Sequence, residues 1–166
     1  MVMDITALYP SVPHKQGLDS FGRALTMRRE KSVHTKFLVR LMMVLKSNTF
    51  EWDKKLFLQI LGTAIGTRSA PTFCGLYVGE LEQEILNSWA SLDPEALPAD
   101  WWRFIEDCLF WLSGTLGDLV IFVHFVNQFN PYIKFTVDYN FTTRSVDLEF
   151  LDLKIWVDDD GIIKTI

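Results

Sequence analysis

The stretch WWRFIEDCLFWL, residues 101–112, constrains the fold of this chain more than any other. Two short apolar runs flank Glu106 and Asp107, and polar residues of this kind commonly occupy turns. The pattern predicts a β-hairpin, and therefore an antiparallel sheet, with two carboxylates at its tip. An acid pair in a turn carries little functional information by itself, so its meaning depends on what the rest of the chain supplies.

The remaining apolar segments have two different periods, and their order predicts an α+β fold. Helical patterns are expected over residues 18–29, 35–46, 71–89 and 117–129; strand patterns are expected over residues 1–9, 50–52, 56–60, 132–139, 148–157 and 162–166. FLVRLMMVL is apolar on nearly every side, which is typical of a helix buried between layers. Phe73, Tyr77, Leu81 and Ile85 share one helix face. Helices packed on one mainly antiparallel sheet are the expected architecture.

Composition supports a globular chain that forms one compact domain over residues 1–166, because 49% of the residues are hydrophobic. The net charge of -5 argues against a free-standing nucleic-acid binder. Cys74 and Cys108 are isolated among apolar residues, which indicates buried reduced thiols in an intracellular protein, nuclear or cytoplasmic. The longest apolar run, LVIFVHFV, is too short to span a bilayer, and no targeting signal is seen, so no membrane partner is expected.

A Gly- and Thr-rich loop, LGTAIGTRSAP, leads into the third expected helix. Ser69 is a candidate cap and Pro71 falls in the first turn. The backbone N–H groups at such a helix start can contact phosphate, although this signal is weak alone. Asp4 lies at the end of an expected strand, and the Glu106–Asp107 pair lies in the turn of an expected hairpin. Carboxylates in such positions, together with a phosphate-binding loop, are what two-metal phosphoryl transfer requires. We therefore expect Asp4 to lie beside the Glu106–Asp107 turn.

Five segments carry a resemblance to a known family: DITALYPSVPHKQGL, LQILGTAIGTRSAPTFCGLYVGELEQEIL, WWRFIEDCLFW, FNPYIKFT and LEFLDLKI. In order and spacing they resemble the reverse transcriptases of Penelope-like retroelements, over essentially the whole chain. The resemblance implies the palm of a right-handed RNA-directed DNA polymerase, an RRM-like antiparallel sheet backed by helices. Its implied partners are a nucleic-acid primer-template and deoxynucleotides, and its implied reaction is transfer of deoxynucleotides to a primer 3′-hydroxyl.

The resemblance also implies roles for individual residues. Asp4, Glu106 and Asp107 correspond to the catalytic carboxylates that hold two Mg²⁺ or Mn²⁺ ions. Tyr9 corresponds to the aromatic gate that excludes a 2′-hydroxyl, whereas from the residues alone it could equally be a core aromatic. LEFLDLKI resembles the hairpin that grips the primer end. The implied nucleotide- and template-binding residues are Tyr9, Gly66, Thr67, Arg68, Pro71 and Lys134.

Two departures from the family pattern lower the expected activity. Glu106 stands where the family has Asp, and one extra methylene moves a carboxylate by about 1 Å, which can cost about a hundredfold in rate. Metal binding is therefore expected to be weak. The fingers and thumb are also expected to be missing, so exposed apolar surface could drive self-association. The alternative from another class is a non-catalytic palm remnant or interaction module.

Two other features are expected to be structural. The run Asp158, Asp159 and Asp160 before Gly161 is typical of a solvated turn and does not indicate a metal site. The Trp101–Trp102 pair favours core and edge packing over a platform for stacking bases.

Overall fold

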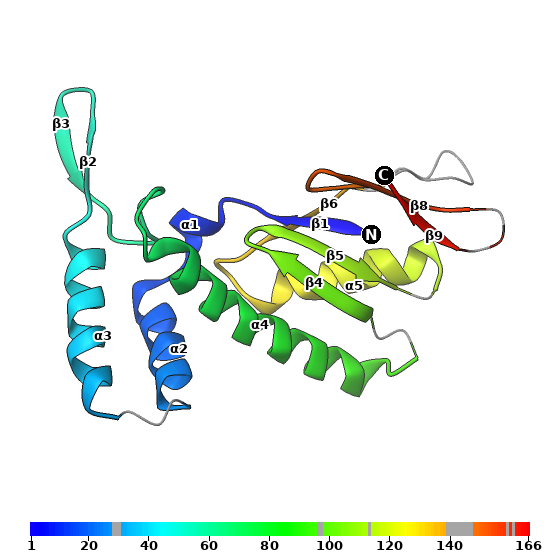
Figure 1. Ribbon diagram of the computed structural model, residues 1–166, viewed down its shortest axis with the longest axis horizontal. Coiled ribbons are helices and arrows are strands. Elements are labelled where there is room, and N and C mark those ends of the chain that lie inside the picture. The colour runs from blue at the N-terminus through cyan, green and yellow to red at the C-terminus, as the bar shows by residue number, and fades with distance from the viewer. Residues whose placement is uncertain (28–30, 96–97, 113, 139–147, 159, 161) are drawn as a thin grey trace. The chain divides into compact units, whose positions relative to one another are not determined.

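The structure is a computed structural model of residues 1–166, and it describes residues 1–27, 31–95, 98–112, 114–138, 148–158, 160 and 162–166 (Figure 1). Its elements are β1 (Val2–Ile5), α1 (Leu8–Ser11), α2 (His14–Thr26), α3 (Lys31–Lys46), β2 (Thr49–Trp52), β3 (Lys55–Leu58), α4 (Ala70–Leu92), β4 (Ala99–Phe104), β5 (Asp107–Trp111), α5 (Leu116–Phe129), β6 (Phe135–Asp138), β7 (Leu148–Phe150), β8 (Leu153–Val157) and β9 (Ile163–Thr165). The strand pairs are antiparallel, which confirms the predicted α+β class.

The chain divides into two compact units. One consists of Met1–Thr6 and Leu86–Ile166, and the other consists of Ala7–Ile85. We call them the sheet unit and the helical unit. The sequence predicted a single domain over residues 1–166, and that remains a prediction.

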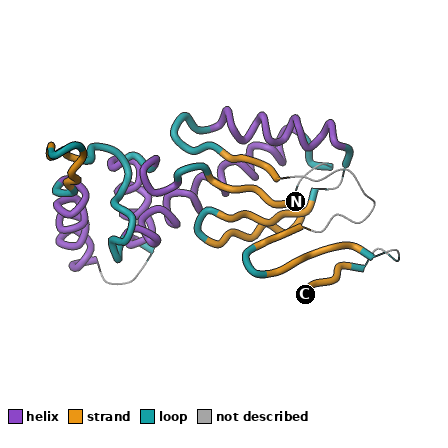
Figure 2. The backbone as a smooth tube through the Cα atoms, turned by 90° about the horizontal axis from the view of Figure 1, so that it is seen from above, coloured by secondary structure: helices purple, strands orange, loops and turns teal. Residues whose placement is uncertain are grey.

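The sheet unit is built on four strands in the order β4-β5-β1-β6. Figure 2 draws strands in orange and helices in purple. Successive side chains of a strand point to opposite faces, so one face collects the buried residues Met3, Ile5 and Phe110. Phe110 packs against Phe122 of α5 with ring centroids 5.6 Å apart, and Trp89 meets Phe122 edge-on at 5.0 Å. This face of the sheet therefore forms the core of the unit.

Helix α5 begins at a capping box, which fixes its start. The Thr115 side chain accepts a hydrogen bond from the Asp118 backbone N–H, and the Asp118 carboxylate accepts one from the Thr115 backbone N–H at 2.6 Å. The bond from the Thr115 backbone N–H, and a second one that the Thr115 hydroxyl donates to the same carboxylate at 2.8 Å, hold the pKa of the Asp118 carboxyl below its ordinary value. The cap directs α5 onto the sheet, where Leu119 and Val126 are buried.

The apolar pattern predicted one strand over residues 148–157, whereas the family resemblance implied a hairpin within LEFLDLKI. The structure has a hairpin of β7 and β8, with Leu151 in its turn at φ 55°. β9 extends it to three strands. The expected acidic turn follows β8: the Asp158 carboxylate accepts hydrogen bonds from the backbone N–H groups of Asp160 and Ile162, at 3.1 and 2.8 Å. Asp159 and Gly161 lie outside the described residues.

In the helical unit, α2 packs against α3, and the stacked rings of Phe21 and Phe37 lie 5.4 Å apart. Leu41 and Leu45 of α3 are buried, but the side chain of Met43 is 60% exposed. The expectation that FLVRLMMVL is buried between layers is therefore wrong. Helix α3 packs against α2 along one stripe of its surface. The apolar residues of a helix do not by themselves predict how many other elements pack against it.

Helix α4 presents the predicted apolar face: Phe73, Tyr77, Leu81 and Ile85 are all buried. Arg23 of α2 binds Glu80 of α4, and its Nε donates to Oε1 at 2.8 Å. Cys74 and Cys108 are buried reduced thiols, as predicted. Among the described residues, no helix combines the length and apolarity needed to cross a bilayer.

Candidate functional site

The predicted closeness of Asp4 and Asp107 is confirmed by the strand register of the sheet unit. β1 and β5 run antiparallel as neighbours, and Asp4 stands directly opposite Asp107. About a hundred residues separate them in the sequence, so the fold brings them together.

The hydrogen-bond pattern places the two carboxylates on the same face of the sheet, close to each other. Met1 and Phe110 exchange both backbone hydrogen bonds, at 2.8 and 3.0 Å, and the Ile5 N–H donates to the Glu106 carbonyl at 3.0 Å. Because bonded pairs alternate with non-bonded ones, Asp4 and Asp107 form a non-hydrogen-bonded pair. Such pairs have Cα atoms about 4.5 Å apart and the closer side chains.

This proximity has an electrostatic consequence. Desolvation by its surroundings, followed by repulsion from the Asp107 carboxylate, raises the pKa of the Asp4 carboxyl above its ordinary value. Like charges directly opposite each other on neighbouring strands destabilise a sheet. The register thus places two carboxylates where a cation between them would offset a repulsion.

The turn that presents Asp107 is strained. Ile105 has a φ of 55°, although a β-branched residue rarely adopts positive φ. Such outliers cost on the order of 1–3 kcal/mol and cluster at functional sites. Arg103 donates from Nη1 to the Ile105 carbonyl at 3.0 Å, and the Glu106 carbonyl accepts from Ile5, so the turn is held by its neighbours.

Glu106 has an enclosed carboxylate oxygen, Oε2, with no hydrogen-bond partner among the described residues. A buried acceptor without a partner costs about 1–3 kcal/mol or more, and an absent water or ion is one of the explanations for such an atom. Of Asp4, Glu106 and Asp107, only Glu106 has a buried side-chain oxygen without a hydrogen-bond partner among the described residues.

The three acids nevertheless do not form a complete ligand set in this conformation. Across the described residues, no three Asp, Glu, His or Cys side chains are grouped so that they could hold a metal ion. Mg²⁺ is often bound through one or two carboxylates together with waters and substrate phosphates. The facing pair of Asp4 and Asp107 fits that requirement, whereas Glu106 is not grouped with the pair.

Tyr9 lies in the helical unit, in the short helix α1, and is half-buried. Its carbonyl accepts a hydrogen bond from the Thr63 N–H at 2.8 Å, and the Gly62 N–H donates to the Val12 carbonyl at 2.9 Å. His14 Nε2 lies 2.6 Å from the Gly62 carbonyl. The Gly-rich loop is therefore fastened to the segment that carries Tyr9, and this ring is not fully enclosed as a core aromatic would be.

The predicted binding residues of this loop are mostly accessible. Gly66 has φ 90° with open space where a Cβ would lie, and Arg68 and Pro71 are exposed. Thr67 is half-buried and its hydroxyl donates to the Ala64 carbonyl. The Ser69 carbonyl accepts the first bond of α4, from Phe73 N–H at 2.9 Å, as an N-cap residue does.

Lys134 makes contacts that the resemblance did not imply. Its ammonium donates to the carbonyl of Asn127 and to that of Asn130, the latter at 2.8 Å, where α5 ends. A cation near the last carbonyls stabilises a helix end. In this conformation Lys134 therefore closes a helix, and its contact with phosphate remains a prediction.

The adjacent tryptophans separate, as neighbours in a strand must. Trp101 stacks on Phe110 in the core with ring centroids 5.2 Å apart, which confirms the expected packing role for that residue. Trp102 is 49% exposed and shares a face with Phe104 and Asp107. Strand alternation could have predicted this difference, whereas the strained Ile105 and the bond from Arg103 had no signal in the sequence.

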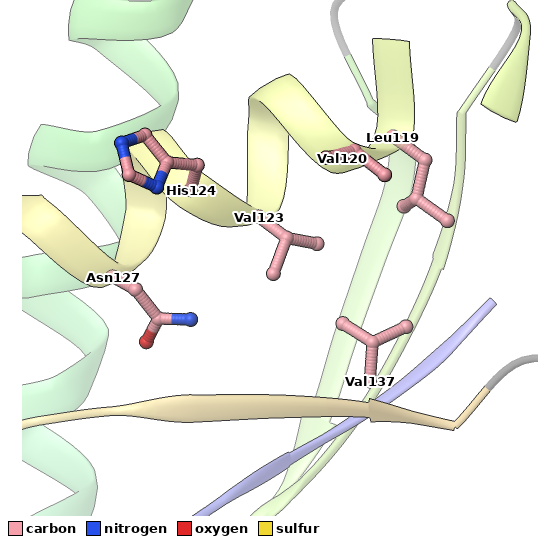
Figure 3. A pocket seen from close by; sticks show the side chains of 6 residues that line it. All are labelled: Leu119, Val120, Val123, His124, Asn127 and Val137. Atoms are coloured by element: carbon pink, nitrogen blue, oxygen red, sulfur yellow. The ribbon is translucent and has the colours of Figure 1, made fainter. Parts of the chain in front are cut away.

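A cavity of about 340 Å³ lies elsewhere in the sheet unit, between α5 and β6 (Figure 3). Leu119, Val123, His124 and Val137 are among its lining residues. Val137 pairs with Met3, so it belongs to the face opposite that of Asp4. The cavity does not adjoin the acid pair.

Comparison with protein-family models, with curated proteins and with solved structures found no match.

Replacing Asp4 by Asn is expected to stabilise the fold at neutral pH. Because the pKa of Asp4 is higher in the folded chain than in the unfolded one, its contribution to stability is full below the ordinary carboxyl pKa of about 3.9 and is lost as pH rises through the raised value. Urea unfolding of both proteins at pH 7 and pH 3 measures the gain, which should vanish at pH 3.

Asp100→Asn supplies the control for that comparison. Asp100 is an exposed acid of β4 with φ 52°, where Asn is well tolerated, so its replacement removes one negative charge and keeps the facing pair of Asp4 and Asp107. Equal pH profiles for wild type and Asp4→Asn would show that Asp4 and Asp107 do not repel each other.

Proposed function

We propose that residues 1–166 form the palm domain of a reverse transcriptase similar to those of Penelope-like retroelements. The proposed reaction is template-directed transfer of deoxynucleotides to a primer 3′-hydroxyl. The observation that carries the proposal is the register that sets Asp4 opposite Asp107 at a non-hydrogen-bonded position. The strained hairpin tip at Ile105 and the partnerless oxygen of Glu106 support it.

In this proposal Asp4 and Asp107 hold Mg²⁺ or Mn²⁺, with Glu106 as the third ligand. When bound, such ions neutralise charge on the attacking and leaving oxygens of phosphoryl transfer. The chain's own part is to hold two carboxylates close together, with Asp4 exposed, at the energetic cost of their repulsion. The proposed sugar gate is Tyr9, and the proposed template and nucleotide contacts come from the accessible loop that includes Gly66.

We propose that turnover is weak because of Glu106. Its longer side chain is not grouped with Asp4 and Asp107, and Mg²⁺ demands near-ideal octahedral geometry. The isolated chain of 166 residues is expected to give no measurable primer extension, because its net charge of -5 offers little to retain a duplex.

The second candidate is a non-catalytic interaction module with the same fold. What favours it is the exposed apolar surface of the β2–β3 hairpin, where Trp52 is 72% exposed and Leu56 is 78% exposed. Metal binding with primer extension separates the enzyme from the module, because a module needs neither.

The decisive test of the polymerase is a chimera that carries fingers and thumb from a close relative. Asp107→Asn should abolish its Mg²⁺-dependent primer extension. Tyr9→Ala should admit ribonucleotides, because the ring that blocks the 2′-hydroxyl is gone. Extension assays with deoxy- and ribonucleotides measure both effects.

Tyr132→Ala is the matched control, because Tyr132 is an exposed tyrosine to which the proposal gives no role. It should keep the preference for deoxynucleotides. Unchanged sugar preference in Tyr9→Ala would remove the gate from the proposal, and extension that survives Asp107→Asn would overturn the polymerase itself.

A further inference from the structure

The β2–β3 hairpin of the helical unit is apolar and exposed on both faces. Trp52 is 72% exposed, Leu56 78% and Ile60 81%, although each is large and apolar. Phe50 and Phe57 stack across the strands with centroids 5.5 Å apart. An isolated two-stranded hairpin is marginally stable in water, so this one needs a further contact.

The turn adds to that need. Asp53 and Lys54 both have positive φ, 50° and 60°, as a two-residue type I′ turn requires. Asp tolerates this conformation, but Lys adopts it at a cost that Gly would avoid. The hairpin therefore forms despite a strained turn and without a buried face.

The outer edge of β3 has unpaired hydrogen-bonding groups. Trp52 pairs with Lys55 and Phe50 with Phe57, and the Gln59 N–H donates to the Asn48 carbonyl at 2.8 Å. In this alternation the N–H and C=O groups of Leu56 and Leu58 point away from β2. Within the described residues, the sheet has two strands only, so no third strand takes these groups.

We propose that β3 pairs with β3 of a second copy of this chain, to form a continuous four-stranded antiparallel sheet. Unpaired strand edges are templates for such pairing, and Lys55 is the one charged residue of β3. A two-fold axis that passes beside Phe57 places Leu56 opposite Leu58 of the other copy. The backbone N–H and C=O groups of both residues point away from β2 and can therefore pair across the axis. Lys55 then meets Gln59 of the other copy, so no like charges face each other.

The exposed area suits a second copy. Six large apolar residues of the hairpin region are 42% to 81% exposed, and a standard interface takes roughly 800 Å² from each partner. They are Phe50, Trp52, Leu56, Phe57, Leu58 and Ile60. Pairing along one edge covers part of this area, so a dimer that dissociates in the micromolar range is expected.

Cysteine cross-linking tests the register directly. In the proposed dimer, Phe57 of one copy lies opposite Phe57 of the other copy at a non-hydrogen-bonded position. The Cβ atoms of such a pair lie about 4.5–5.5 Å apart, near the span of a disulfide. Phe57→Cys should give a covalent dimer under mild oxidation, seen on a non-reducing gel. Thr49→Cys, on the far edge of the hairpin, should not, and the native cysteines are buried.

Sedimentation equilibrium tests the association without a new thiol. Wild type should show a concentration-dependent dimer. Leu56→Pro should be monomeric, because it removes an outward N–H that the hairpin itself does not use, while Leu92→Lys, at a residue 69% exposed outside the hairpin, should remain a dimer. A monomeric wild type, or cross-linking of Thr49→Cys as complete as that of Phe57→Cys, would overturn the proposal.

Discussion

Replacing Glu106 by Asp is expected to tighten Mn²⁺ binding and, in the chimera with fingers and thumb, to raise primer extension by about a hundredfold. The shorter side chain restores the ligand length that the family pattern has at the hairpin tip. It also withdraws the enclosed oxygen that lacks a partner at present. Calorimetric titration with Mn²⁺ measures the affinity, and a primer-extension assay measures the rate.

Wild type and Asp4→Asn complete the comparison. Asp4→Asn should lose Mn²⁺ binding, because one of the two facing carboxylates is gone. If all three proteins bind Mn²⁺ alike, the acid pair is only a turn and the proposed function is wrong. If wild type binds as tightly as Glu106→Asp, the longer side chain is a competent ligand and the expected impairment is wrong.

Replacing Gly62 by Ala is expected to cost about 3 kcal/mol or more of unfolding free energy. A Cβ on Gly62 would lie 2.3 Å from Cα of Pro10 and 2.4 Å from the Tyr9 carbonyl oxygen, and neither backbone atom can turn away. The φ of 71° adds strain for any residue with a side chain. Urea unfolding, followed by circular dichroism, measures the loss.

Gly66→Ala is the matched control. Gly66 also has positive φ, at 90°, but nothing lies within 4 Å of its Cβ position. Its replacement should cost only the backbone strain, about 1 kcal/mol. Equal losses in the two variants would mean that the loop does not pack against the Tyr9 segment as described.

The parts of the fold that sequence predicted are those that local patterns determine. Two apolar arms around a polar turn gave the β4–β5 hairpin, and a four-residue apolar spacing gave the buried face of α4. The placement of Asp4 beside this hairpin was also predicted, because two-metal phosphoryl transfer requires carboxylates from two strands to lie close together. No local sequence pattern predicts that these two distant segments are neighbours.

The errors have a common physical cause. The burial of α3 depends on how many elements cover it, and the division of residues 148–157 depends on one residue, Leu151, adopting positive φ. These outcomes follow from tertiary context, which overrides what residue type alone favours.

The strained turn at Ile105 has a consequence for the order in which the chain assembles. A β-branched residue that disfavours the turn conformation makes the β4–β5 hairpin a poor nucleus, so its closure has to wait for support from β1. Joining β1 to β5 closes a loop of about a hundred residues, which is slow because its entropy is lost before the contacts form. Asp4 and Asp107 therefore meet through one of the least local contacts of the chain. A folding intermediate without β1 in place would keep most of its helices and have no acid pair.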